Sequence, residues 1–543
     1  MLRILPLGGL GEIGKNCMVL EAGGEAIIVD CGVTFGGREF GVDVTHPAFD
    51  WLHSYKGKLR GVVLTHGHED HIGAVPYLLR EIDVPVYGPP YAMSLLDTRA
   101  DDHPVLRHAR LQRVEPGAPI KLGDFRVTPI RVTHSIADAT ALAIDTPEGL
   151  VVHTGDFKID DGGFGQQQFD MEGFKALGKR GVELLMSDST NVERSGQSTR
   201  EVDVHLTLED DITRAKGAVF VGFFSSNTAR LDALGRIADR TGRKLVLLGR
   251  GMQNHAKVAR SHGFLSWSES RLWPADRVAE VPREKLLIVC TGTQAEPGGA
   301  LGRLAAGTHK DLDVRDGDTV IFSSRVIPGH EPEVDAMTDG LIRRGARVLT
   351  PATHEGRHAS GHATRSEQAQ MLELCAPRCF LPLHGRLRHL SLHAELARQW
   401  GAEACVIENG TEARLSAEGL AVGESFSSGV VRTWDKRAVS AETLSTRRSL
   451  GFGGVVVVGL RLTASAKLLG IDDIVQHGVC AEKDELRLRE EVRRDVLAEL
   501  SAVVHRASDA EIEERVSRAV RRASQRVLGF RPEVLTNVVR AER

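Results

Sequence analysis

Residues 65–71, Thr65-His66-Gly67-His68-Glu69-Asp70-His71, decide the fold of this chain. They follow the apolar, strand-like run GVVL and lead into the apolar stretch HIGAVPYLLREI, which the pattern predicts as one helix. His66 and His68 are two residues apart at a strand exit, so both side chains can point the same way. Asp70 and His71 lie in the turn into the helix and can point toward a second, neighbouring position. The cluster therefore predicts two adjacent cation sites, whereas a solvated His-rich loop is the simpler alternative.

Other apolar runs in the sequence end in the same residue types. Asp30 ends AIIVD, His134 ends VTPIRVTH, Asp156 ends GLVVHTGD and His384 ends CFLPLH. Any one of these residues alone would more often be structural. Together they repeat one geometry, an apolar strand whose last residue is His or Asp. This pattern predicts a metal site at the edge of a sheet, where imidazole and carboxylate ligands suit zinc, with manganese as the alternative.

The length of the chain and the change of sequence pattern along it predict several domains. The 543 residues exceed the roughly 250–300 residues at which a single core stops growing. The first part alternates β-branched runs with Gly-rich turns, whereas residues 204–353 read as strand–loop–helix units with a parallel sheet. Near the C-terminus, the strand GGVVVVGLRL precedes helical stretches near residues 484–505 and 509–528, and RPEVLTNVV closes the chain. The second helix begins with a capping box from Ser508 to Glu511.

Composition limits the compartment and the partners. The net charge of -4 gives no large basic field, so any nucleic-acid groove must be local. The seven cysteines are scattered and odd in number, which suits a reducing compartment. No apolar run approaches the roughly 18 residues of a membrane span. We therefore expect a cytoplasmic protein without a membrane segment.

These motifs resemble, in their order, the metallo-β-lactamase superfamily and its nucleic-acid-processing β-CASP branch. Asp30 fits the first motif, HGHEDH the second, His134 the third and Asp156 the fourth. Asp188 in SDST, His362 in HASGH and His384 in LPLHG fit the three motifs of the branch. The resemblance implies that one ion is held by His66, His68, His134 and Asp156. It implies that a second ion is held by Asp70, His71, His384 and again Asp156, and that Asp30 orients ligands or the bridging water.

The resemblance also implies a division into domains. Residues 1–203 and 369–425 would form a split metallo-β-lactamase domain, an αββα sandwich. Residues 204–368 would form an inserted parallel-sheet β-CASP domain, residues 426–449 a linker, and residues 450–543 a small α+β domain. Because ligands lie on both sides of the insert, we expect the active site in the cleft between the first two domains.

A closer resemblance is to the ribonuclease J family, through LGGLGEIGKN, GVDVTHP, LTHGHEDHIGAVPYLL, HTGDFKID, SDSTN, RHASGHA and LPLHG. It implies a two-zinc enzyme that hydrolyses single-stranded RNA in RNA maturation and decay. Such an enzyme acts as a 5′-to-3′ exonuclease and as an endonuclease. The resemblance also implies a homodimer through the C-terminal domain. An apolar stripe of Ile512, Val516, Val520 and Val527 predicts either core packing or that dimer contact.

Residue chemistry suggests further roles. His362 would be the acid or phosphate-stabilising group, with Asp188 as its orienter and Asp70 beside the reacting phosphate as a metal ligand. RNA phosphate would be bound by His358, Ala359, Ser360, Gly361 and His362, together with Ser225, Ser226 and Asn227. The alternatives are a polar hinge for the first group and a helix cap for the second. We do not expect a structural calcium ion, since Thr446 stands where an acidic ligand would be needed.

Two rival functions share the metal cluster. A small-molecule metallo-hydrolase would need neither the long insert nor Asp188 and His362. A DNA-directed nuclease of the same branch differs from a ribonuclease in no local feature, and the RNA 2′-hydroxyl would discriminate between the two.

Overall fold

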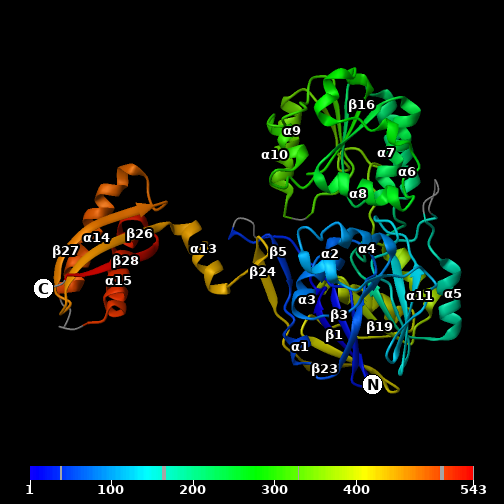
Figure 1. Ribbon diagram of the computed structural model, residues 1–543, viewed down its shortest axis with the longest axis horizontal. Helices are drawn as coiled ribbons and strands as arrows, with labels where there is room; N and C mark the ends of the chain where they lie inside the picture. The colour runs from blue at the N-terminus through cyan, green and yellow to red at the C-terminus, as the bar shows by residue number, and fades with distance from the viewer. Residues whose placement is uncertain (37–39, 162–166, 328, 502–506, 542–543) are drawn as a thin grey trace. The chain divides into compact units, whose positions relative to one another are not determined.

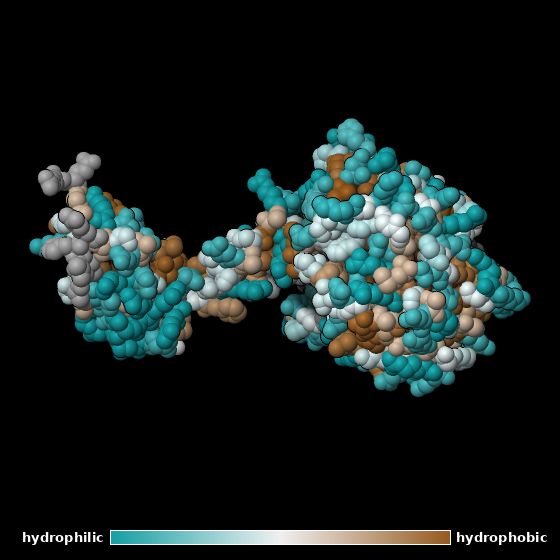
Figure 2. Space-filling view, turned by 90° about the horizontal axis from the view of Figure 1, so that it is seen from below, coloured by the Kyte–Doolittle hydropathy of each residue, from teal (hydrophilic) through white to brown (hydrophobic). Residues whose placement is uncertain are grey.

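The structure is a computed structural model that describes residues 1–36, 40–161, 167–327, 329–501 and 507–541. The chain divides into two compact units. The first unit comprises Met1–Thr34 and His46–Val430, and the second comprises Phe35–Thr45 and Val431–Arg543. Hydrophilic side chains cover most of the face of each unit that Figure 2 shows, with separate small hydrophobic patches. Within the described residues, no helix has the length and apolar character needed to cross a membrane.

Two large sheets form the centre of the first unit. One has the strand order β23 (Gly419–Ser425), β22 (Thr411–Ser416), β1 (Leu2–Gly8), β3 (Cys17–Ala22), β4 (Glu25–Val29), β6 (Lys58–Val63), β7 (Val86–Gly88) and β8 (Leu111–Arg113). The other has the order β21 (Glu403–Ala404), β19 (Cys379–Leu383), β13 (Val182–Asp188), β12 (Gly149–His153), β11 (Thr140–Thr146), β10 (Phe125–Arg131) and β9 (Ile120–Leu122). Apolar side chains from both sheets, such as Leu20 and Leu142, form one buried cluster between them.

Helices cover the outer faces of the two sheets (Figure 1). Helices α5 (Met171–Arg180), α11 (Arg365–Cys375) and α12 (Leu387–Gln399) bury apolar side chains against the second sheet. The first sheet carries α1 (Asp50–Ser54), α2 (Glu69–Ile72), α3 (Val75–Glu81), α4 (Pro90–Asp97) and the 3-10 helix Pro104–His108. This is the expected αββα sandwich. A short pair, β2 (Leu10–Gly11) and β20 (Gly385–Arg386), joins distant segments beside it.

The stretch predicted as one helix over residues 71–82 is two short helices, α2 and α3, and the prediction of a single helix was wrong. The break lies at Gly73 and Ala74. Pro76 lies in the first turn of α3, where its missing N–H costs nothing, but in a continuous helix it would leave the Ile72 carbonyl without its donor and its ring would clash with that carbonyl.

A parallel sheet forms the inserted domain of the first unit, as the strand–loop–helix pattern predicts. Its strand order is β15 (Lys244–Leu248), β16 (Leu286–Cys290), β14 (Val219–Gly222), β17 (Thr319–Phe322) and β18 (Arg347–Leu349). Its helices are α6 (Glu201–Arg214), α7 (Thr228–Thr241), α8 (Arg250–Ser261), α9 (Ala300–Ala306) and α10 (Glu331–Arg343), with 3-10 turns at Glu269–Arg271, Ala275–Glu280 and Arg283–Lys285. Figure 1 shows α9 and α10 on one face of the sheet and α6 and α7 on the other.

The second unit is a small α+β domain. Strands β27 (Leu468–His477), β26 (Val455–Thr463) and β28 (Glu533–Ala541) form its sheet. Helices α14 (Glu482–Ser501) and α15 (Asp509–Leu528) share its core, and the stripe Ile512, Val516 and Val520 is buried there. The core-packing interpretation of the stripe is therefore correct. The Ser508 capping box is also present. Residues 502–505, the predicted end of the first helix, lie outside the described residues.

The stretch expected as a linker has regular structure. Strands β24 (Val430–Trp434) and β25 (Arg437–Val439) form a hairpin extended by β5 (Val44–Pro47), and helix α13 (Ala441–Gly453) follows. Arg447 on α13 donates from Nη1 to the carbonyl oxygens of Phe40 and Gly41, at 3.1 and 2.9 Å. These two hydrogen bonds attach α13 to the loop before β5, and the absence of a calcium ion stays a prediction.

Candidate metal centre

Three imidazoles and one carboxylate converge at the edge of the sandwich. His66 Nε2 and His134 Nε2 each lie 3.1 Å from His68 Nδ1. Asp156 Oδ2 lies 3.9 Å from His66 Nε2 and 3.8 Å from His134 Nε2. Ligand atoms about 2.1 Å from a tetrahedral zinc ion would stand about 3.4 Å from one another. The four side chains therefore have the spacing of one metal site, the first cluster.

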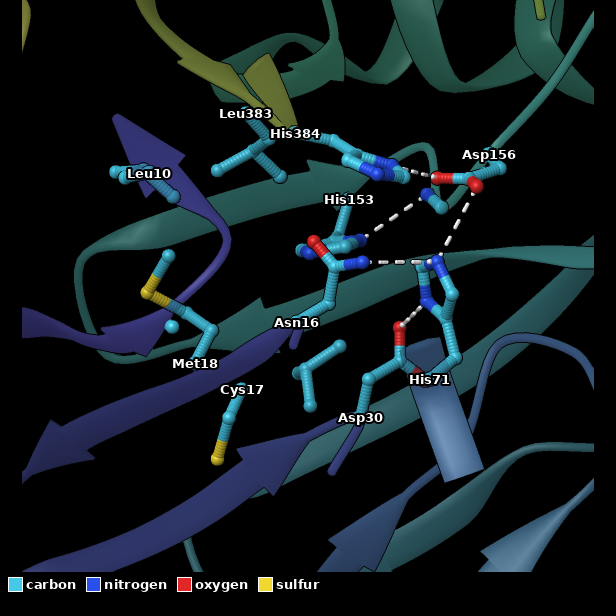
Figure 3. A pocket seen from close by; sticks show the side chains of 13 residues that line it. Leu10, Asn16, Cys17, Met18, Asp30, His71, His153, Asp156, Leu383 and His384 are labelled. Carbon is cyan, nitrogen blue, oxygen red and sulfur yellow. Dashed lines mark hydrogen bonds and ion pairs between the residues drawn. The ribbon is translucent and has the colours of Figure 1, made fainter. Parts of the chain in front are cut away.

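Four side chains form a second cluster beside the first, and they share Asp156 with it. Asp156 Oδ2 lies 3.2 Å from His71 Nε2, and Asp156 Oδ1 lies 2.6 Å from His384 Nδ1. Asp70 Oδ2 lies 3.5 Å from His384 Nε2 and 3.7 Å from His71 Nε2. Figure 3 shows Asp156 with His384 and His71, both of the second cluster, and Asp156 Oδ2 also lies near His66 and His134 of the first cluster. All seven residues that the resemblance assigned as ligands are brought together.

Strand ends hold these side chains, as the sequence pattern indicates. His66 follows β6, His134 follows β10, Asp156 follows β12 and His384 follows β19. His384 has a φ of 48°, a left-handed conformation that costs free energy in a residue with a side chain. Such strain concentrates at functional sites, where the surrounding structure enforces it.

Outer hydrogen bonds turn the imidazoles toward the clusters. Asp30, whose φ is 59°, accepts from Thr65 N and Oγ1 and from His71 Nδ1, each at 2.8 Å. Because the Thr65 hydroxyl donates to Asp30, it accepts from His66 Nδ1 at 3.0 Å. His134 Nδ1 donates to the Gly361 carbonyl at 2.6 Å. These partners place the ring protons outward and leave the inward nitrogens as acceptors, the tautomers that metal ligands need.

Burial keeps most of the first cluster uncharged. Burial lowers the pKa of His66 and of His68 well below the usual value, and lowers the pKa of His134 to about 3. Burial alone would also lower the pKa of His71 in the second cluster, but the carboxylates of Asp156, Asp70 and Asp30 together outweigh it and raise that pKa. The three neutral imidazoles of the first cluster, beside the buried carboxylate of Asp156, form a donor set that fits a divalent cation.

Asn16 belongs to this site although the sequence patterns did not identify it. Its Nδ2 lies 3.0 Å from His71 Nε2 (Figure 3). The same nitrogen donates to the backbone oxygen of Asp70 at 3.2 Å. Asn16 precedes β3 in a Gly-rich loop, and no ligand spacing connects it with the HGHEDH segment. Only the folded chain brings them together.

His362 and Asp188 form a pair against both clusters. His362 Nδ1 donates to Asp188 Oδ2 at 2.7 Å, and Asp188 Oδ1 accepts from Thr190 N and Oγ1. Burial alone would lower the pKa of His362, but the carboxylates of Asp188 and Asp156 outweigh it and raise the pKa to about 9. The His362 ring centre lies 5.1 Å from that of His134. A protonated imidazole is therefore held beside the metal ligands.

The loop 358–362 contacts the site through several of its members. A Cβ on Gly361 would lie 2.7 Å from both His134 Cε1 and Ser135 Oγ, so only glycine allows this approach. Ser360 Oγ accepts from Asn191 Nδ2 at 2.8 Å and from His362 N at 3.2 Å. Ala359 is buried, and His358 Nδ1 lies 3.3 Å from the Ser323 carbonyl oxygen.

The three residues of the turn 225–227 in the inserted domain make different contacts. Asn227 caps α7, since its Oδ1 accepts from Arg230 N at 2.9 Å. Ser226 Oγ lies 3.1 Å from His68 Nε2, the nitrogen that faces away from the first cluster. Ser225 is half-buried beside Gly251. Of the three, Ser226 is the one whose hydroxyl contacts a residue of the first cluster.

Comparison with known proteins gives the family. Residues 10–162 match the metallo-β-lactamase superfamily, residues 216–341 the ribonuclease J β-CASP domain, and residues 442–541 the ribonuclease J C-terminal domain. Ribonuclease J of Synechocystis sp. is 36% identical over 484 residues, which are 88% of this chain and 76% of that protein. The chain belongs to the ribonuclease J family. The predicted resemblance and fold class are thereby confirmed.

Members of this family from other bacteria match over nearly the whole chain. Ribonuclease J of Thermus thermophilus is 35% identical over 556 residues, covering 99% of this chain and 95% of that protein. Among solved structures, a protein of unknown function from Enterococcus faecalis V583 has a TM-score of 0.55 and 16% identity, covering 76% of this chain and 99% of its own. The likeness to the Enterococcus faecalis protein concerns the fold alone.

Proposed function

We propose that this chain is a two-metal-ion ribonuclease that hydrolyses RNA phosphodiester bonds. The observation that carries the proposal is Asp156, which lies between the two ligand clusters. Its Oδ1 lies 2.6 Å from His384 Nδ1 of the second cluster, and its Oδ2 lies 3.9 and 3.8 Å from His66 Nε2 and His134 Nε2 of the first. Membership of the ribonuclease J family supports RNA as the substrate. Divalent metal binding is a property of the superfamily, and we propose two zinc ions, with manganese as the alternative.

The proposed ligands divide between two ions. The first ion would be held by His66, His68, His134 and Asp156, and the second by Asp70, His71, His384 and Asp156. When bound, the ions would supply Lewis acidity that offsets charge on the scissile phosphate and makes water a stronger nucleophile. Asp30 and Thr65 hold His71 and His66 in the required orientation.

His362 is proposed to give a proton to the leaving 3′-oxygen, or to stabilise the phosphate by a charge-assisted hydrogen bond. Asp188 orients its ring and keeps it protonated, as the 2.7 Å contact and the raised pKa of His362 support. The products would carry a 5′-phosphate and a 3′-hydroxyl. Both exonucleolytic and endonucleolytic cleavage would use this pair.

A 5′-monophosphate pocket is proposed for the 5′-to-3′ exonuclease activity. It would comprise the loop 358–362 and, from the inserted domain, Ser225, Ser226 and the backbone at Asn227. These groups offer short donors that can surround the several oxygens of a monophosphate. A triphosphate is bulkier, so a closed pocket would reject it. We further propose that the protein is cytoplasmic, because its cysteines are free. We also propose that it forms a homodimer through its C-terminal domain.

The decisive experiment compares matched single-stranded RNA and DNA of one sequence, labelled at the 5′ end. Faster cleavage of RNA, abolished by a chelator and restored by zinc or manganese, is the expected result. Preferred cleavage of DNA would instead favour the DNA-directed alternative of the same branch.

A further inference from the structure

A hydroxyl of the inserted domain reaches a proposed metal ligand of the sandwich. Ser226 Oγ, in the turn between β14 and α7, lies 3.1 Å from His68 Nε2. The other ring nitrogen of His68, Nδ1, faces the first cluster at 3.1 Å from both His66 Nε2 and His134 Nε2. The ring therefore has one nitrogen toward the cluster and the other toward the inserted domain.

The two ring nitrogens have complementary tasks. An imidazole that offers the lone pair of Nδ1 to a cation carries its proton on Nε2. That N–H would donate to Ser226 Oγ, since a hydroxyl has acceptor lone pairs as well as one donor. The O–H of Ser226 would still be available to a phosphate oxygen. The same side chain can thus hold His68 and take part in the proposed phosphate pocket.

The outward nitrogens of the other ligands differ in where their partners lie. That of His134 donates to the backbone carbonyl of Gly361, in the loop 358–362, so both His134 and His68 are oriented by segments far along the chain. His66 Nδ1 donates to Thr65 and His71 Nδ1 donates to Asp30, both within the sandwich. His68 instead depends on a residue 158 positions later in the chain, in the parallel-sheet domain. Its orientation is therefore linked to the seating of that domain.

The turn that carries Ser226 is fixed within the inserted domain. The backbone oxygen of Ser226 accepts from Thr228 N at 2.8 Å, and Asn227 caps α7. Arg230, one turn further on, is buried and donates from Nη2 to Glu201 Oε2 at 2.8 Å and from Nη1 to the Arg357 carbonyl oxygen at 3.2 Å. The hydroxyl of Ser226 therefore has a set position relative to the rest of its domain.

We propose that Ser226 is a positioning residue for the first metal site. By accepting from His68 Nε2–H, it fixes the tautomer and the ring orientation of this ligand. It thereby makes metal affinity at the first cluster depend on the inserted domain. The inference rests on the proposed ligand set. The experiment has different outcomes for a failure of the inference and for a failure of the ligand set.

The test measures metal affinity in the full chain without RNA, by competition with a chromophoric chelator. In Ser226→Ala we expect the affinity for one of two ions to fall about 10- to 100-fold, as when other outer partners of metal ligands are removed, while the second ion is unaffected. Ser226→Thr keeps the hydroxyl and should restore most of the affinity. Ser225→Ala removes the neighbouring hydroxyl in the same turn and should leave both affinities as in the wild type.

Three outcomes separate the explanations. Equal affinities in Ser226→Ala and wild type would overturn the proposal. So would an affinity loss accompanied by a lower melting temperature of the metal-free protein and not restored by Thr, because that pattern indicates ordinary loop packing. His68→Ala should lose the first ion, and its retention of both ions would refute the ligand set instead. Cobalt substitution gives an independent readout, since its absorption spectrum changes when a ligand ring rotates.

Discussion

At the scale of single residues, Asp156 has a role that no neighbouring side chain can take over. It is buried, its Oδ1 contacts His384, and its Oδ2 contacts His71 and faces His66 and His134. Asp70 contacts only the second cluster, and its side chain is partly exposed. The two carboxylates therefore differ in how much of the centre depends on them.

Replacing Asp156 should be the most damaging single change among the ligands. Asp156→Ala should lose both ions and lower RNA cleavage by at least about 10²- to 10³-fold, because groups that stabilise transition-state charge contribute on that order. Asp70→Ala should mainly empty the second site. Metal content by mass spectrometry and single-turnover cleavage are the measurements. Retained turnover and unchanged metal content in Asp156→Ala would disprove the shared-ligand arrangement.

The pair of His362 and Asp188 leads to a pH prediction. Activity that needs protonated His362 falls as the pH rises through its pKa, which Asp188 helps to raise to about 9. Asp188→Asn keeps the shape but removes the charge, so the alkaline limb of the rate profile should move to lower pH. Bound cations would lower the pKa of His362 in both the wild type and Asp188→Asn. The pKa would still be lower in Asp188→Asn than in the wild type. Single-turnover rates measured from about pH 6 to about pH 10 test this.

A matched variant controls for the loss of one negative charge elsewhere. Asp101→Asn changes an exposed carboxylate far along the chain from the pair and should give the wild-type profile. Coinciding alkaline limbs in wild type and Asp188→Asn would show that His362 does not act through its proton.

At the scale of elements, the sequence is informative where chemistry follows strand ends. The positions of His66, His134, Asp156 and His384 were predictable because each ends an apolar run. The hydrogen bond between Ser226 and His68 was not, because it depends on how two domains approach each other. The split of the predicted helix just before Pro76 was missed for a different reason: apolar periodicity outweighed a proline signal that was visible in the sequence.

The loop 358–362 is the element on which end recognition should depend. Ser360→Ala should reduce the preference for a 5′-monophosphate over a triphosphate more than it reduces internal cleavage. One or two charge-assisted hydrogen bonds contribute about 1.5–3 kcal/mol each and about 1.4 kcal/mol is tenfold, so the wild-type preference should be roughly ten- to a thousandfold. The Ser360 hydroxyl also accepts from Asn191 and from His362 N, so part of the effect would come from the loop itself.

The measurement uses one RNA with a 5′-monophosphate, triphosphate or hydroxyl end. His362→Ala should damage exonucleolytic and internal cleavage alike, whereas Ser270→Ala, an exposed serine of the inserted domain, should change neither. Equal exonucleolytic rates on the three ends in the wild type would contradict the pocket and leave the metal centre untouched.

At the scale of the whole molecule, the question is how chains associate. The apolar stripe of α15 is used inside the domain, so it cannot also form an interface. The sheet of the same domain has an opposite face, away from the core. There Val457 pairs with Val475 and with Leu535, and Leu535 is 60% exposed. An apolar row on an exposed sheet face is a more suitable surface for a second copy of the chain.

The homodimer should therefore depend on this sheet of the second unit. Deleting the chain from Gly454 onward should give a monomer with weakened activity, because the proposed contact lies in the removed sheet. Leu535→Glu in the full chain should also give a monomer, since a charge in the apolar row would be desolvated on association. Leu486→Glu changes an exposed leucine of α14 and should leave the assembly unchanged. Sedimentation equilibrium measures all three. A truncated chain that still sediments as a dimer would place the interface in the first unit, and a dimeric Leu535→Glu beside a monomeric truncation would place it elsewhere in the second.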